Sequence, residues 1–230
     1  MVRIKAMLVL AFFAAVFLTV GCSNGADSSS ESSGQAQRAA VGSSAGDGIL
    51  VAYFSWADNT SMNLTDDMAI DALTTASIVP PGNTGLIAYA IQDAIGGDLF
   101  LIQAADPYSG DYNTCVERVA DELDDNERPP LKALVDSIDD YDTVFIGYPI
   151  WNNTCPRAVL TFIESHDLSG KTIALFSAYG GGRIQVSVDE IKMALPDDCT
   201  VLEPAFGAGR EGFAEAQQNA EAWAQALGIG

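Results

Sequence analysis

The sequence predicts an α/β fold in which helices cover both faces of a five-stranded parallel sheet. From residue 49 onward, short apolar runs alternate with stretches whose apolar residues recur at helical spacing. The first, third and fourth runs are apolar at almost every position, as expected for strands that lie under helices on both faces. The expected strands are Ile49–Ser55, Asp98–Gln103, Thr143–Tyr148, Lys171–Ser177 and Thr200–Leu202.

Helices are expected between and after these strands. Apolar stripes over residues 87–95, 159–163, 184–195 and 213–227 each fall on one helical face, so each predicts a helix that packs on the sheet. Gly228 follows the last stripe, where a glycine commonly ends a helix. The stretch over residues 111–126 is more polar and predicts a helix with one side in solvent.

Residues 1–21 have the layout of a secretory signal peptide. Arg3 and Lys5 precede an apolar run over residues 6–20 that is short for a membrane-spanning helix. The segment from Thr19 to Cys22 resembles a bacterial lipobox, although Thr19 replaces the more usual leucine. The resemblance implies that Cys22 carries lipid and becomes the first mature residue. We therefore expect export and a lipid anchor on the extracytoplasmic face of the cell membrane; an ordinary signal peptide without lipidation is the alternative.

Two further segments follow the signal peptide. Residues 22–47 are rich in Ser, Gly and Ala and contain few large apolar residues, so they cannot bury enough surface to fold. We expect a disordered tether there. Residues 48–230 are of the right size for one domain with one core.

The composition excludes several classes of function. The chain has 31 acidic and 11 basic residues and a formal net charge of −20, which would repel nucleic-acid phosphates. We expect no nucleic-acid partner, and contact with the membrane only through the lipid anchor. His166 is the only histidine, so a His-rich metal site is excluded, and a Ser-His-Asp triad would depend on this one residue near an expected helix end.

The cysteines indicate no metal site. Apart from Cys22 they are Cys115, Cys155 and Cys199, which lack the spacing of zinc or iron–sulfur ligands. We interpret them as small buried residues, and the sequence leaves their disulfide state open. Cys155 begins an expected helix, where the helix dipole can lower a thiol pKa, so a redox role for Cys155 is the alternative.

Three loops follow the first, third and fourth expected strands. Parallel strands end at the same edge of a sheet, and open α/β sheets bind ligands beyond that edge. The loops lie at residues 53–56, 149–154 and 177–182. Each combines small or hydroxyl residues with an aromatic residue, which suits a ligand with an anionic tail and a flat ring.

These loop residues resemble those of the flavodoxin-like family in order and spacing. The segments that carry the resemblance are residues 51–56, Gly82-Asn83-Thr84, residues 145–151 and residues 180–182. It covers nearly the whole domain and implies a three-layer sandwich with strand order 2-1-3-4-5 and a bound FMN. In this family the first loop holds the FMN phosphate and the other two hold the isoalloxazine ring. The implied cofactor-binding residues are Ser55, Trp56, Gly82, Asn83, Thr84, Pro149, Ile150, Trp151, Asn152, Asn153, Thr154, Ser177, Ala178, Tyr179, Gly180 and Gly181.

The phosphate loop has two candidate Asn-Thr pairs, at residues 59–60 and 83–84. The second pair is favoured because a Pro-Pro-Gly turn precedes it and the apolar stripe of a helix begins soon after it. The first pair follows Asp58, whose carboxylate would repel a phosphate. We therefore interpret residues 57–81 as an insertion between the two halves of the phosphate loop.

The resemblance implies a redox protein that carries electrons or reduces a quinone-like acceptor through its flavin. The partner is then a redox protein or a nicotinamide or quinone molecule, and no catalytic side chain is expected, because the flavin supplies the chemistry. Carrier and enzyme are not distinguished by the sequence. The alternative is an interaction module that keeps the fold without FMN, suggested by Asp58, the split phosphate loop and the single aromatic Trp151 where the family often has two.

One further motif is rejected. Residues 207–212 fit the G-x-G-x-x-G pattern of dinucleotide-binding loops, but they precede the last expected helix, and no strand follows to complete the βαβ unit.

Overall fold

The computed structural model describes residues 48–60, 78–181 and 184–229. The expected signal peptide, Cys22, the expected tether and most of the expected insertion at residues 57–81 lie outside the described residues. Export, lipidation and the domain boundary at residue 48 therefore stay predictions.

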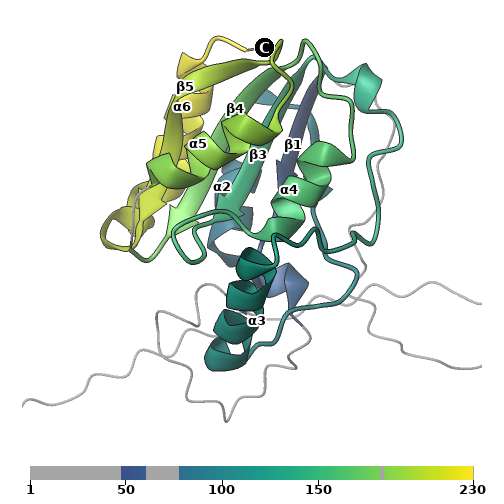
Figure 1. Cartoon of the computed structure of the whole chain (residues 1–230). Coiled ribbons are helices and arrows are strands. Elements are labelled where there is room, and N and C mark those ends of the chain that lie inside the picture. The colour runs from purple at the N-terminus through teal and green to yellow at the C-terminus, as the bar shows by residue number, and fades with distance from the viewer. Residues whose placement is uncertain (1–47, 61–77, 182–183, 230) are drawn as a thin grey trace, which may run out of the picture. The chain divides into compact units, whose positions relative to one another are not determined.

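Five parallel strands form one sheet (Figure 1). They are β1 Ile49–Tyr53, β2 Asp98–Leu101, β3 Thr143–Pro149, β4 Thr172–Tyr179 and β5 Thr200–Gly209. Their order is β2-β1-β3-β4-β5, which confirms the predicted topology. Val51 of β1 pairs with Leu99 of β2 on one side and with Phe145 of β3 on the other.

Helices cover both faces of the sheet. They are α2 Gly82–Ile95, α3 Tyr112–Asp124, α4 Arg157–Glu164, α5 Ile184–Ala194 and α6 Ala216–Ala226, with the short 3₁₀ helices η1 Ala57–Asn59, η2 Ile138–Asp140 and η3 Arg210–Glu215. α2 and α6 pack on one face, and α4 and α5 pack on the other (Figure 1). In the described part of the chain, no helix has both the length and the apolar composition needed to cross a bilayer.

The side chains of β1 alternate between the two layers of the core. Ile49 and Val51 pack with the α2 and α6 side, and Leu50 and Ala52 pack with the α4 and α5 side. All four are at most 2% exposed. Burial of a large apolar side chain contributes about 1.5–3 kcal/mol, so the central strands form a rigid support for the loops at their carboxyl ends.

β5 is longer than predicted. The sequence predicts its end at Leu202. The structure continues the strand to Gly209, with a break in register opposite Ala174 and Phe176 of β4. β5 lies at the edge of the sheet, where a proline is tolerated. As a result, the first glycines of the rejected G-x-G-x-x-G pattern belong to a strand.

Candidate functional site

A cavity of about 760 Å³ lies at the carboxyl ends of β1, β3 and β4. Its volume is typical of small-molecule sites. The structure brings most of the predicted site residues to its wall: Ser55, Trp56, Asn83, Thr84, Pro149, Ile150, Trp151, Asn152, Ala178, Tyr179, Gly180 and Gly181. The remaining predicted residues do not line it; they are Gly82, Asn153, Thr154 and Ser177.

α3 and η3 contribute wall residues that sequence reasoning missed. They are Tyr112, Cys115, Val116, Val119 and Ala120 of α3, with Arg210 and Phe213 of η3. α3 stands apart from the other helices, beyond one end of the sheet (Figure 1). The apolar residues of α3 recur at helical spacing, so the sequence does indicate an apolar face on this helix. The sequence does not show that this face borders a cavity.

The amino terminus of α2 forms one end of the cavity. Pro81 precedes the helix and provides no side-chain cap, and the first turn holds no acidic residue. The side chains of Asn83 and Thr84 line the cavity, and neither hydrogen-bonds to another described residue. Unpaired helix N–H groups and the positive end of a helix dipole attract anions. This end of the cavity is therefore suited to a phosphate.

Ser55 joins the two halves of this loop. It follows β1, and its hydroxyl donates a hydrogen bond of 2.8 Å to the carbonyl of Pro81 at the start of α2. The predicted split of the loop by an insertion is consistent with this contact. The hydroxyl must rotate if it is to donate to a ligand instead.

Asn59, of the disfavoured Asn-Thr pair, has a structural role. Its side chain is 2% exposed and donates to the carbonyls of Ser55 and Ile102 at 2.9 and 3.0 Å. Its Oδ1 accepts from the N–H of Ala104 at 2.8 Å. Because the amide is fully used inside the protein, Asn59 is not available to a ligand.

Asp58 lies close to the same loop but does not line the cavity. One of its carboxylate oxygens is buried without a hydrogen-bond partner. Burial raises the pKa of Asp58.

The loop after β3 is a tight turn. Trp151 and Thr154 exchange two backbone hydrogen bonds of 2.9 Å. Asn152 and Asn153 between them have φ angles of 46° and 67°, in the left-handed region that asparagine tolerates better than most residues. Both asparagines are exposed, but only Asn152 lines the cavity.

Aromatic rings hold Trp151 from one side. Its ring meets those of Phe54, Trp56 and Tyr108 edge-on, with centroid distances of 5.2, 6.1 and 5.0 Å. Tyr108 is fixed in turn, because its hydroxyl donates to the buried carboxylate of Glu122 at 3.0 Å. Trp151 is thus a rigid part of the wall. Its contact with an isoalloxazine ring stays a prediction.

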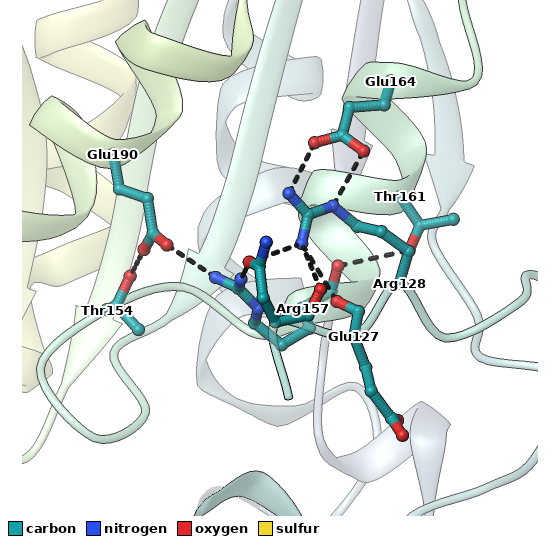
Figure 2. A network of polar contacts seen from close by, with 8 residues as sticks. Glu127, Arg128, Thr154, Arg157, Thr161, Glu164 and Glu190 are labelled. Carbon is teal, nitrogen blue, oxygen red and sulfur yellow. Dashed lines mark hydrogen bonds and ion pairs between the residues drawn. The ribbon is translucent and has the colours of Figure 1, made fainter. Parts of the chain in front are cut away.

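A polar network ties Thr154 of the same turn to α4 and α5 (Figure 2). The Thr154 hydroxyl donates to Glu190 of α5, so Thr154 faces away from the cavity. Arg157 of α4 is 4% exposed and pairs with Glu190 at 2.5 Å. Arg157 also donates to the side chain of Asn126, which accepts from Arg128 as well.

The loop after β4 is held differently. The ring of Tyr179 lies over the glycines of β5: a Cβ added at Gly207 or Gly209 would lie 3.0 Å from it. Gly180 and Gly181 follow, and a Cβ at Gly180 would meet the guanidinium of Arg210 at 3.0 Å. Ser177, just before this loop, is fully buried, and its hydroxyl has no partner. Ser177 lies within β4 and does not line the cavity.

The surroundings of the cysteines and of the histidine indicate structural roles. Cys115, Cys155 and Cys199 are free thiols, and burial raises the pKa of Cys115 and of Cys155 to about 12. This is opposite to the lowered pKa that a redox role of Cys155 would need.

His166 follows α4, accepts from the N–H of Val135 at 3.0 Å and lies 2.7 Å from the carbonyl of Phe162. Among the described residues, no group of acidic, histidine and cysteine side chains is arranged to hold a metal ion.

Comparisons with known proteins identify a family. Residues 72–205 match the profile of the family described as Flavodoxin. A flavoprotein from Bacteroides eggerthii DSM 20697 is similar in structure, with 32% identity, a TM-score of 0.58 and coverage of 79% of this chain and 98% of that one. A flavoprotein from Bacteroides uniformis ATCC 8492 has 26% identity, a TM-score of 0.57 and coverages of 77% and 97%.

A flavoprotein from Lactobacillus acidophilus NCFM, solved in complex with FMN, is a more distant match. It has 18% identity, a TM-score of 0.49 and coverage of 74% of this chain and 96% of that one. No curated protein sequence matches the chain.

Proposed function

Because the chain belongs to the flavodoxin family, we propose that it binds FMN in the cavity at the carboxyl ends of β1, β3 and β4 and acts as a redox protein. Flavodoxins bind FMN where their strand order reverses, between the first and third strands. In this chain β1 and β3 are neighbours at that point, and the cavity opens there.

The open amino terminus of α2 is the observation that carries the proposal. Its N–H groups have no side-chain cap, and Asn83 and Thr84 are free to donate toward the cavity. These groups would hold the phosphate, assisted by Ser55. Among the described residues, no aspartate or glutamate lines the cavity, so none of them opposes the anionic end of FMN.

The other loops would hold the ring. Trp151 and Tyr179 line the cavity and offer flat apolar surfaces, and the glycines after β4 let the backbone come close to a ligand. When bound, FMN supplies the electron-transfer chemistry. The chain contributes binding, orientation and the exclusion of water, and its described residues provide no lowered thiol pKa or free histidine for a separate reaction.

The first test is a fluorescence titration of FMN with the purified chain, together with the visible spectrum of the chain as isolated. We expect saturable quenching with a Kd of micromolar or tighter, which corresponds to about −8 kcal/mol. Riboflavin, which lacks the phosphate, should bind at least about tenfold more weakly, since charge-assisted hydrogen bonds contribute more than neutral ones.

Variants sharpen this test. Thr84→Val removes one donor at the phosphate end and should weaken FMN but not riboflavin. Thr161→Val is the matched control, because Thr161 lies on α4 and outside the cavity. If the folded chain quenches neither flavin, the proposal is wrong. The buried carboxyl of Asp58 near Ser55 then favours the alternative, an interaction module without FMN.

We further propose that the protein works at the cell envelope, exported by residues 1–21 and anchored through a lipid on Cys22. The support is the resemblance of residues 19–22 to a lipobox. Incorporation of a labelled fatty acid that Cys22→Ser abolishes would support the anchor. Label in the Cys22→Ser chain, or no label in the parent chain, would contradict the lipid anchor.

The electron donor and acceptor are proposed as a class only: a redox protein, or a nicotinamide and a quinone. Turnover of NADH or NADPH with menadione by the FMN-loaded chain would indicate an enzyme. Absence of turnover in a chain that still binds FMN would indicate a carrier.

A further inference from the structure

Arg210 borders a second cavity beside the one already described. This second cavity measures about 360 Å³ and is formed by Tyr179, Gly180, Gly181 and residues 209–212. Tyr179, Gly180, Gly181 and Arg210 also line the main cavity, so the two share a wall. Of the described residues that line the main cavity, Arg210 alone has a charged side chain.

The Arg210 guanidinium is free. It makes no hydrogen bond or ion pair with any described residue, although Glu211 is its neighbour in the same cavity wall. Most other basic side chains of the described residues are held by carboxylates: Arg118, Arg128, Arg157 and Lys192. In a chain with 31 acidic and 11 basic residues, an arginine without a carboxylate partner at a cavity is available to a ligand.

The position of Arg210 separates it from the phosphate end. Ser55 follows β1, Arg210 follows β5, and β3 and β4 lie between those strands. Three spacings of about 4.8 Å place the strand ends roughly 14 Å apart. The guanidinium of Arg210 lies beside the loop after β4, where a Cβ added at Gly180 would be 3.0 Å from it. An FMN phosphate held at α2 therefore leaves the guanidinium to another anion.

We propose that Arg210 and the second cavity form a subsite for an oxyanion, a carboxylate, sulfonate or phosphate, on the small molecule that exchanges electrons with the protein. A guanidinium presents a planar fork that matches such groups with two hydrogen bonds. Tyr179 supplies an aromatic surface next to it, and the glycines leave the backbone exposed. This inference rests on the proposed function, because the second molecule has a role only beside a bound flavin.

The test compares two probes of the same shape, anionic 2-naphthalenesulfonate and neutral 2-naphthalenesulfonamide, by calorimetric titration of the purified chain with and without FMN. We expect the FMN-loaded parent chain to bind the sulfonate about tenfold more tightly than the sulfonamide. Arg210→Gln should remove this preference, and Arg210→Lys should retain part of it. Lys132→Gln is the control of equal charge: Lys132 is exposed and lines neither cavity, and its N–H donates to the carbonyl of Gln103. Gln103 lies just beyond β2, at the edge of the sheet opposite β5.

Three results overturn the inference: no preference in the parent chain, a preference that survives Arg210→Gln, or equal losses in Arg210→Gln and Lys132→Gln. A fourth is competition between FMN and the sulfonate together with a tenfold loss of FMN affinity in Arg210→Gln, because Arg210 would then hold FMN itself. If the parent chain does not bind FMN at all, the proposed function fails separately, and the titration without FMN still measures whether Arg210 selects the anion.

Discussion

The loops after β3 and β4 border the same cavity but are held in different ways. The turn from Trp151 to Thr154 is closed by two backbone hydrogen bonds and packed against three aromatic rings. It is also tied to α4 and α5 through Glu190 and Arg157 (Figure 2). The loop at residues 179–181 contains two exposed glycines; its Tyr179 lies against the glycines of β5, and its Gly180 lies against Arg210.

This difference indicates a division of roles. A wall whose side chains are fixed by neighbours presents one shape, which favours the tight and oriented binding of a flat ring. A glycine-rich wall beside a free arginine can adapt to a second molecule. Substitutions in the first wall should therefore affect stability, and substitutions in the second should affect ligands.

The largest effect is expected from Glu190→Ala. It leaves the buried guanidinium of Arg157 without its carboxylate and frees Thr154, so it should cost about 2–3 kcal/mol, less than a fully buried pair because Glu190 is partly exposed. Urea unfolding measures this. The control is Glu164→Ala, which breaks the exposed pair with Arg128 and should cost under about 1 kcal/mol. Equal losses in both variants would contradict the special role of the pair next to the turn.

A smaller effect is expected from Asn153→Ala. Alanine disfavours the left-handed conformation of this position, so the variant should lose about 1 kcal/mol in the free energy of unfolding. Glycine adopts this conformation freely, so the free energy of unfolding of Asn153→Gly should be close to that of the parent chain. Asn153 does not line the cavity, so FMN affinity should fall only if the turn itself distorts. Equal stability of the alanine and glycine variants would show that the turn is not strained as we describe.

Gly181→Ala should act in the opposite direction on stability. No atom of the described residues lies within 4 Å of the added Cβ, and the substitution reduces the freedom of the unfolded chain, so stability should stay the same or rise by about 0.5 kcal/mol. The methyl group projects from a residue that lines both cavities, so flavin or probe affinity should fall. Thermal unfolding and the two titrations measure both effects. A clear loss of stability would mean that this loop is as constrained as the turn after β3.

The smallest effect is expected at the loop after β1, from Asp58→Asn. The pKa of Asp58 is raised in the fold, so the folded protein loses stability as pH rises from the ordinary aspartate value through the raised one. The asparagine variant avoids this loss. Its Tm should exceed that of the parent by about 1–2 °C at pH 7, and the difference should vanish near pH 4. The variant should also bind FMN slightly more tightly at pH 7. A difference that does not depend on pH would rule out this titration as its cause.

Local patterns in the sequence predicted the sheet and the region of the site. Apolar runs that alternate with helical stripes predicted five parallel strands, and the first, third and fourth runs are apolar at almost every position because helices cover both of their faces. The carboxyl ends of parallel strands lie together by geometry, so Ser55, Trp151 and Tyr179 could be assigned to one cavity from their places in the chain.

The sequence by itself thus determined the fold class and the three strand-end loops, because both follow from local periodicity and from the parallel arrangement of strands. Only the tertiary structure decided which residues of α3 and η3 complete the wall, that Thr154 faces Glu190 and not the cavity, and that Arg210 has no partner. These facts depend on contacts between residues about thirty or more positions apart, or on the absence of such contacts. A periodic pattern records which face of a helix is apolar, but it does not record what that face meets.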